Sequence, residues 1–72
     1  MIELNDEVCT SGHVGRFVVI DLKEGTAVIQ LFGDHSETGA RVYFTPTMEV
    51  PLGALTVIGK NHKRPSVYTV VG

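Results

Sequence analysis

One segment constrains the fold more than any other: a hairpin of two strands that are apolar on both faces. Residues 16–22 (RFVVIDL) and 26–32 (TAVIQLF) are dense in β-branched and aromatic side chains, which favour strands. The turn between them ends in Gly25, which adopts a positive φ without steric cost. A strand pair with two apolar faces must be covered on both, by closure of the sheet or by another subunit.

Alternation along the first strand predicts which side chains share a face. Phe17, Val19 and Asp21 are expected on one face, and Val18, Ile20 and Leu22 on the other. Because both faces are apolar, the pattern does not decide which of them lies against the core. The predicted core consists of the following residues or their alternating partners: Val8, Phe17, Val19, Val28, Leu31, Val42, Phe44, Leu52, Leu55 and Val57.

The rest of the chain is short strands separated by glycine and proline. Strands are expected at 7–10, 41–45, 48–50 and 56–58, with a single 3₁₀ turn at 51–55. No segment predicts a packed α-helix. The pattern favours an all-β fold, a small barrel of five to six short antiparallel strands with one 3₁₀ turn.

Charge separates the barrel from the C-terminal end. Residues 1–59, the predicted barrel, carry eight acidic and three basic side chains, whereas residues 60–72 carry three basic ones and no acid. We interpret 60–72 as a basic linker followed by an apolar strand at 66–71 (SVYTVV). That strand either covers its own barrel or adds to the sheet of a neighbour.

Composition limits the class of protein. A chain of 72 residues with 43% hydrophobic residues and a net charge of −2 is one small globular domain with a marginal core. The single cysteine, Cys9, excludes an intrachain disulfide and suits a reducing cytoplasm. No apolar run approaches the ~18 residues of a membrane span, so no membrane partner is expected.

Residues 6–58 resemble the SH3-like barrels of the KOW type. The matching residues are Asp6 and Val8, then Gly12-His13-Val14-Gly15 leading into Val18, Ile20 and Asp21, and finally Val28. The resemblance implies an SH3-like barrel, a fold that carries nucleic-acid binders, peptide binders and enzyme subunits alike.

The segment 51–55 (PLGAL) also looks like a turn of the type II dihydrofolate reductases, which are tetramers of SH3-like chains with a shared pore. Residues 47–50 are Thr, Met, Glu and Val, where that family has a Val-Gln-Ile-Tyr run. The Gln and Tyr are absent, and Glu49 would place negative charge where anionic ligands pass. No catalytic residue is carried over to this chain.

Local clusters of reactive residues give no catalytic or metal site. Cys9 and His13 are four residues apart, but a zinc site also needs His35 and His62 to converge on them. We favour a small buried thiol and exposed histidines. Residues 34–36 (DHS) hold the residue types of a hydrolase triad, yet neighbours in one loop point in different directions. The turn 12–15 is interpreted as a turn rather than as a phosphate cradle.

Two surfaces are candidates for binding. Lys60, Lys63 and Arg64 could contact phosphates, with Arg16 nearby and with Tyr68 and Tyr43 as stacking aromatics, although the acidic remainder repels a polyanion. The apolar strand offers Val67, Val70 and Val71 as interface residues.

Function is left with three hypotheses. The first is a non-enzymatic binding and assembly module without a cofactor, homo-oligomeric through the hairpin face and the C-terminal strand. The alternatives are a KOW-type nucleic-acid-binding barrel that uses the basic tail, and an oligomeric reductase-like enzyme with a shared pore.

Overall fold

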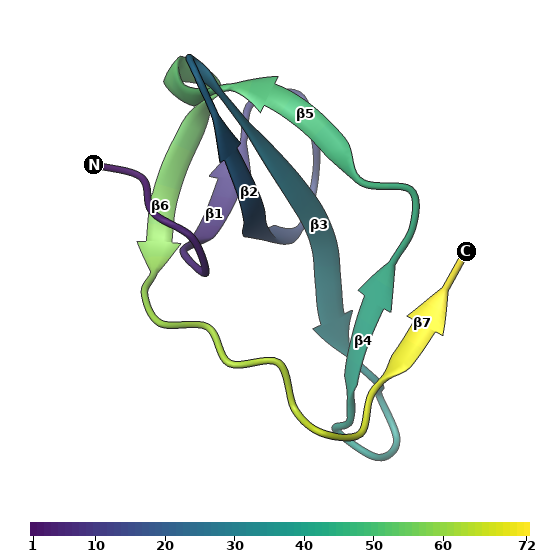
Figure 1. The fold of residues 1–72 in the computed structure, drawn as a ribbon. Coiled ribbons are helices and arrows are strands. Elements are labelled where there is room, and N and C mark those ends of the chain that lie inside the picture. Colours follow the sequence, from purple (N-terminus) through teal and green to yellow (C-terminus); the bar gives the residue numbers. More distant parts are fainter.

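The protein consists of short strands that begin and end near the glycine, proline and polar turn residues of its sequence (Figure 1). The computed structural model describes all 72 residues. It confirms the all-β class and the single 3₁₀ turn. The elements are β1 (Glu7–Thr10), β2 (Arg16–Lys23), β3 (Thr26–Asp34), β4 (Arg41–Phe44), β5 (Met48–Pro51), the 3₁₀ helix η1 (Leu52–Ala54), β6 (Leu55–Gly59) and β7 (Thr69–Val71). None of its helical structure is long and apolar enough to cross a bilayer.

The seven strands form one mixed sheet that stays open. Its order is β6-β1-β2-β3-β4-β7, and β5 pairs with the first half of β3. No pairing joins β6 to β5 or to β7, so closure into the predicted barrel is not confirmed. The count of strands exceeds the predicted five to six.

The prediction that all strands are antiparallel is wrong for the last one. β7 runs parallel to β4, with Val42 opposite Thr69 and Phe44 opposite Val71. Parallel neighbours need a long crossover. Here the chain leaves the end of β4, builds β5, η1 and β6, and returns along residues 60–68 to the start of β4, where β7 begins (Figure 1).

The hairpin of β2 and β3 forms as predicted, but a bulge changes the faces of its outer half. The pairing register shifts between Val19 and Asp21, so that Ile20 is the extra residue of a β-bulge. Beyond the bulge, Asp21 and Leu22 each lie on the face opposite to the expected one. The predicted alternation is wrong there because the extra residue exchanges the two faces for every residue that follows it in the strand.

The core lies on one face of the sheet, called here the core face. Buried side chains from β1, β2 and β3 form its centre, and partly buried ones from β5, η1 and β6 close over them. The central residues are Val8, Phe17, Val19, Ala27 and Ile29.

The predicted core is right for β1 and β2 and partly wrong elsewhere. Val42 is buried, but Val57 on β6 is exposed. In β3 the odd-numbered residues face the core, so Val28 lies on the opposite face and is only partly buried. Leu31, Phe44, Leu52 and Leu55 are intermediate because they rim the core of an open sheet.

The opposite face of the sheet is covered by the C-terminal end of the same chain. Val18, Phe32 and Tyr43 form a second buried cluster there. Residues 60–68, called here the strap, run from β6 to β7 across this cluster, and the ring centre of His62 lies 4.7 Å from that of Phe32. Both faces of the hairpin are thus covered within one chain, without a second copy.

Candidate functional site

The strap is anchored by three hydrogen-bonded polar side chains, of which His62 and Tyr43 are buried and Glu7 is partly exposed. His62 Nδ1 lies 2.7 Å from a carboxylate oxygen of Glu7, and His62 Nε2 lies 2.6 Å from the hydroxyl of Tyr43. The backbone N–H of His62 also donates to the carbonyl of Asn5 at 2.9 Å. The prediction of an exposed histidine is wrong for His62, which is buried.

The role of His62 Nδ1 in these hydrogen bonds follows from its partner, the Glu7 carboxylate. A carboxylate only accepts, so the Nδ1–H of His62 donates to Glu7, and Nε2 shares the second hydrogen bond with the hydroxyl of Tyr43. Burial raises the pKa of Tyr43, although Arg64 and Arg41 act to lower it, so the phenol keeps its proton. Tyr43 and His62 are buried, and their hydrogen bonds fix the strap to β1 and β4.

Gly59 makes room for the side chain of Glu7. A Cβ at Gly59 would lie 2.9 Å from a carboxylate oxygen of Glu7, closer than real contacts allow. The same residue lies opposite Glu7 where the pairing of β1 and β6 shifts register. Glycine at the end of β6 therefore leaves room for the Glu7 carboxylate in its present position.

Arg64 is the second anchor of the strap. Its guanidinium carbon lies 3.9 Å from the ring centre of Tyr43 and 5.3 Å from that of Tyr68. Its Nη2 donates to the side-chain oxygen of the buried Gln30 at 2.8 Å. Tyr68 packs edge-on against Tyr43 with 5.1 Å between ring centres. The arginine is held by two rings and one amide.

Lys60, at the start of the strap, forms ion pairs with two acidic residues of the N-terminal segment. Its Nζ lies 2.9 Å from Glu3 and 2.9 Å from Asp6, whose side chain is almost fully buried. Burial raises the pKa of Asp6, but hydrogen bonds from Lys60 and from the backbone N–H of Glu3 outweigh it and bring the pKa below its ordinary value. The bonds to Asp6 and Glu3 raise the pKa of Lys60.

Arg16 and Arg41 meet at the end of strands β2 to β4. Both approach Asp34, with Arg16 Nη2 at 3.3 Å and Arg41 Nε at 3.5 Å. Their guanidinium carbons lie 4.9 and 5.0 Å from the ring centre of Phe32. Phe32 is paired with Tyr43 across the sheet, and Arg64 covers Tyr43. All three arginines of the chain thus gather around neighbouring aromatic rings.

The structure brings most of the predicted binding residues together, but mainly as contacts within the chain. Arg64, Tyr68 and Tyr43 are in direct contact, and Arg16 is close by on Phe32. Tyr43 is correctly placed but fully buried, so its predicted role as a stacking surface is wrong. Lys60 faces acidic residues, and Lys63 is exposed and makes no ion pair.

The predicted interface residues lie on an open edge of the sheet. β7 is the outermost strand beyond β4, and all three of its residues are exposed. Val67 is 81% exposed, Val70 is 55% exposed and Val71 is 43% exposed. These values are high for valines in or beside a strand, so the edge is apolar and open to water.

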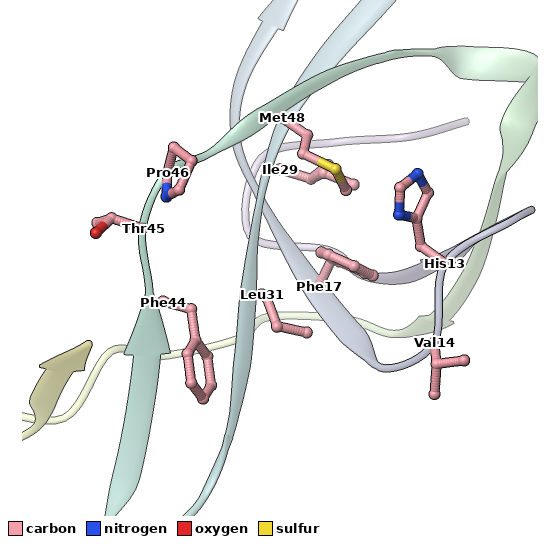
Figure 2. A pocket seen from close by; sticks show the side chains of 9 residues that line it. All are labelled: His13, Val14, Phe17, Ile29, Leu31, Phe44, Thr45, Pro46 and Met48. Carbon is pink, nitrogen blue, oxygen red and sulfur yellow. The ribbon is translucent and has the colours of Figure 1, made fainter. Parts of the chain in front are cut away.

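The core face also holds a cavity of about 330 Å³ that the sequence did not indicate (Figure 2). Most of its lining residues are apolar, among them Phe17, Ile29, Phe44 and Met48. His13 stands at the rim with no side-chain hydrogen bond, while Thr45 points away from the cavity (Figure 2). Its lining joins residues from the turn before β2 and from the segment after β4, which lie far apart in the sequence.

The other chemistry-bearing residues stay apart. No three His, Cys, Asp or Glu side chains lie close enough together to hold a metal ion. Cys9 is half-buried and unpaired on β1. In the 34–36 segment, Asp34 faces the arginines, and His35 Nδ1 accepts from the N–H of Glu37.

Sequence reasoning missed Glu7 and Asp6 as partners of the strap. A signal was available in the strap's spacing, since Lys60, His62 and Arg64 alternate along an extended segment. No protein-family model matches the chain, and no curated protein or solved structure is significantly similar to it.

Proposed function

We propose that the protein is a non-enzymatic assembly module that forms a dimer through the open edge of β7. The observation that carries the proposal is the exposed apolar edge of Val70 and Val71, with Val67 just before it. An unpaired strand edge offers a row of backbone N–H and C=O groups to another strand. If this edge paired with the same edge of a second copy, its apolar side chains would be buried away from water.

The edge of β7 lacks the features that keep natural edge strands apart. Such strands are protected by charged side chains, prolines or bulges. β5, which pairs only with β3, has Glu49 and Pro51. β7 has neither, and residues 66–72 contain no charged side chain. Two copies therefore meet at this edge without repulsion between like charges.

Symmetry fixes how two copies would pair. Two β7 strands related by a two-fold axis normal to the sheet run antiparallel, and residues opposite each other must point to the same face. Residues of the same parity are then opposite, as when Val70 lies against Val70 of the second copy. The two sheets become one continuous sheet across the axis.

The hairpin face takes a smaller part than the sequence led us to expect. Val18 and Phe32 are covered by the strap, and only Ile20 and Leu22 remain partly exposed near the turn. The proposal therefore rests on β7. The lone half-buried thiol of Cys9 suits a reducing compartment, and we place the module in the cytoplasm.

The test is the solution mass of matched edge variants, measured by sedimentation equilibrium. The unchanged chain is expected as a dimer at micromolar concentration. Val70→Lys places a charge in the shared edge and should give a monomer that keeps its fold. Ile58→Lys, a change at the other end of the sheet, should leave the dimer intact. A monomeric unchanged chain, or a dimer that only Ile58→Lys dissociates, would contradict the proposal.

The two alternatives receive less support from the geometry. A nucleic-acid site on the basic tail would need cations that Lys60 and Arg64 already direct to Asp6 and Gln30. A reductase-like pore would need residues around position 49, where Glu49 binds Thr26 and Lys23.

A further inference from the structure

Arg16, Asp34 and Arg41 form a compact surface patch, called here the arginine patch. Arg16 lies opposite Phe32 in the pairing of β2 with β3, and Arg41 lies opposite Asp34 in the pairing of β3 with β4. The three polar side chains therefore share the strap face of the sheet, above the Phe32 ring. The patch is open to water, since nearly half of the Arg16 and Asp34 side chains is exposed.

The acceptors in this patch do not match its donors. Two guanidiniums share one carboxylate, so the patch carries a net charge of one positive unit. Arg64, which lies over the ring of Tyr43, adds to the positive potential around the patch. The distances of 3.3 and 3.5 Å to Asp34 are longer than the ~2.8 Å of a well-formed charged hydrogen bond. Asp34 thus satisfies neither arginine fully.

One donor of the patch has no partner at all. Nη1 of Arg41 is shielded from water and makes no hydrogen bond, and it is the only buried side-chain nitrogen or oxygen in the protein in that state. Such orphaned donors are rare in folded proteins and often indicate an absent ion or water. The Arg41 side chain as a whole is 28% exposed, so the guanidinium that carries this nitrogen lies close to the surface.

We propose that Arg16 and Arg41 form a binding site for a phosphate group. Guanidinium forks bind tetrahedral oxyanions by paired hydrogen bonds, and Phe32 holds both forks close to its ring. A phosphate between them would supply acceptors to Arg16 and to Nη1 of Arg41. The group can come from inorganic phosphate, a nucleotide or a nucleic-acid backbone, since all present the same oxygens. The site does not depend on dimer formation.

The test is a titration of the full chain with inorganic phosphate at low salt, followed by NMR of the arginine Nε–H signals and of the backbone amides at Asp34 and Arg41. Saturable shifts at these positions are expected. Arg16→Gln and Arg41→Gln should each weaken binding about tenfold, the size expected for the loss of a charged hydrogen bond. Asp34→Asn removes the competing carboxylate and should strengthen binding about threefold.

Lys23→Gln is the matched control. Lys23 lies 3.4 Å from Glu49 and its side chain is 54% exposed. Arg16 likewise lies 3.3 Å from Asp34, and its side chain is 46% exposed. This variant should bind phosphate as the unchanged chain does. If Arg41→Gln disturbs the fold, Arg41→Lys keeps the charge but loses the fork, and it should still weaken binding.

The proposal is overturned by three results. They are no saturable shift at millimolar phosphate, equal weakening by Lys23→Gln and Arg16→Gln, or weaker binding after Asp34→Asn. A 5′-mononucleotide and a short single-stranded oligonucleotide identify the source of the group. Equal affinity for all three ligands indicates that the phosphate alone is bound, and tighter, salt-sensitive binding of the oligonucleotide indicates the backbone. Val70→Lys should leave all of these affinities unchanged.

Discussion

His62 is the residue on which most of the polar contacts of the strap depend. It joins Glu7 of β1 to Tyr43 of β4 and lies against the ring of Phe32. The sequence favoured an exposed histidine because its neighbours, Asn61 and Lys63, are polar. Its partners are 55 and 19 residues away in the sequence, and no local pattern reports such contacts.

Replacement of His62 should destabilise the protein strongly. His62→Ala leaves the hydroxyl of the buried Tyr43 unpaired, removes the partner of the partly exposed Glu7 and takes a buried ring away from Phe32, which together cost about 2–4 kcal/mol in the free energy of unfolding. His35→Ala, in an exposed loop, should cost less than about 0.5 kcal/mol. Urea unfolding measures both values, and equal effects would show that the chain of hydrogen bonds adds nothing.

Gly59 allows a second prediction for a single residue. Gly59→Ala places a methyl group against Glu7 and should destabilise the protein by about 1–3 kcal/mol. Gly53→Ala is the control, because a Cβ at Gly53 meets no atom within 4 Å and its φ is ordinary. Thermal unfolding should show no loss for Gly53→Ala. A neutral Gly59→Ala would mean that Glu7 can move without cost.

At the scale of elements, the sequence predicted the strands well and their relations less well. β1 and the starts of β2, β3, β4 and β5 coincide with the predicted ones because glycine, proline or polar turn residues precede them. The bulge at Ile20 could not be predicted, since both faces of this strand carry apolar side chains and the alternation does not show an inserted residue. The parallel pairing of β7 depends on the path of the strap, which no strand signal contains.

The strap should behave as part of the fold rather than as an appendage. Deletion of residues 60–72 exposes Phe32 and Tyr43, each contributing about 1.5–3 kcal/mol of burial energy to a domain of marginal stability. Circular dichroism should show that the remaining chain is unfolded at room temperature.

Deletion of residues 69–72 provides the matched control. It removes β7 and keeps His62 and Arg64, so the chain should stay folded but become monomeric. A shortened chain of residues 1–59 with the stability of the full protein would contradict the role given to the strap.

At the scale of the whole molecule, charge joins the two ends of the sequence. The basic strap lies on the acidic N-terminal segment through Lys60, Glu3 and Asp6. The opposite charges of residues 1–59 and 60–72 therefore have a structural use within one chain. This was not evident from composition, which gave a tail that could equally have faced a polyanion.

The Asp6 pair predicts a loss of stability in acid. The pKa of Asp6 in the folded protein lies below its ordinary value, so its contribution is complete above an unfolded pKa of about 3.9 and disappears as the pH falls through the folded pKa. The difference in unfolding free energy between the unchanged chain and Asp6→Asn should be constant from about pH 5 to 7 and shrink below about pH 4. Urea unfolding across this range measures it, and a difference that grows in acid would contradict the sign.

The central claim is that the two-sided hairpin is covered on its second face by the strap. Nuclear Overhauser contacts between the His62 ring and the rings of Phe32 and Tyr43 test it most directly, because the rings are only 4.7 and 5.8 Å apart. We predict strong cross-peaks for both pairs in the full chain at neutral pH. Their absence, with residues 60–68 at random-coil shifts, would contradict the claim.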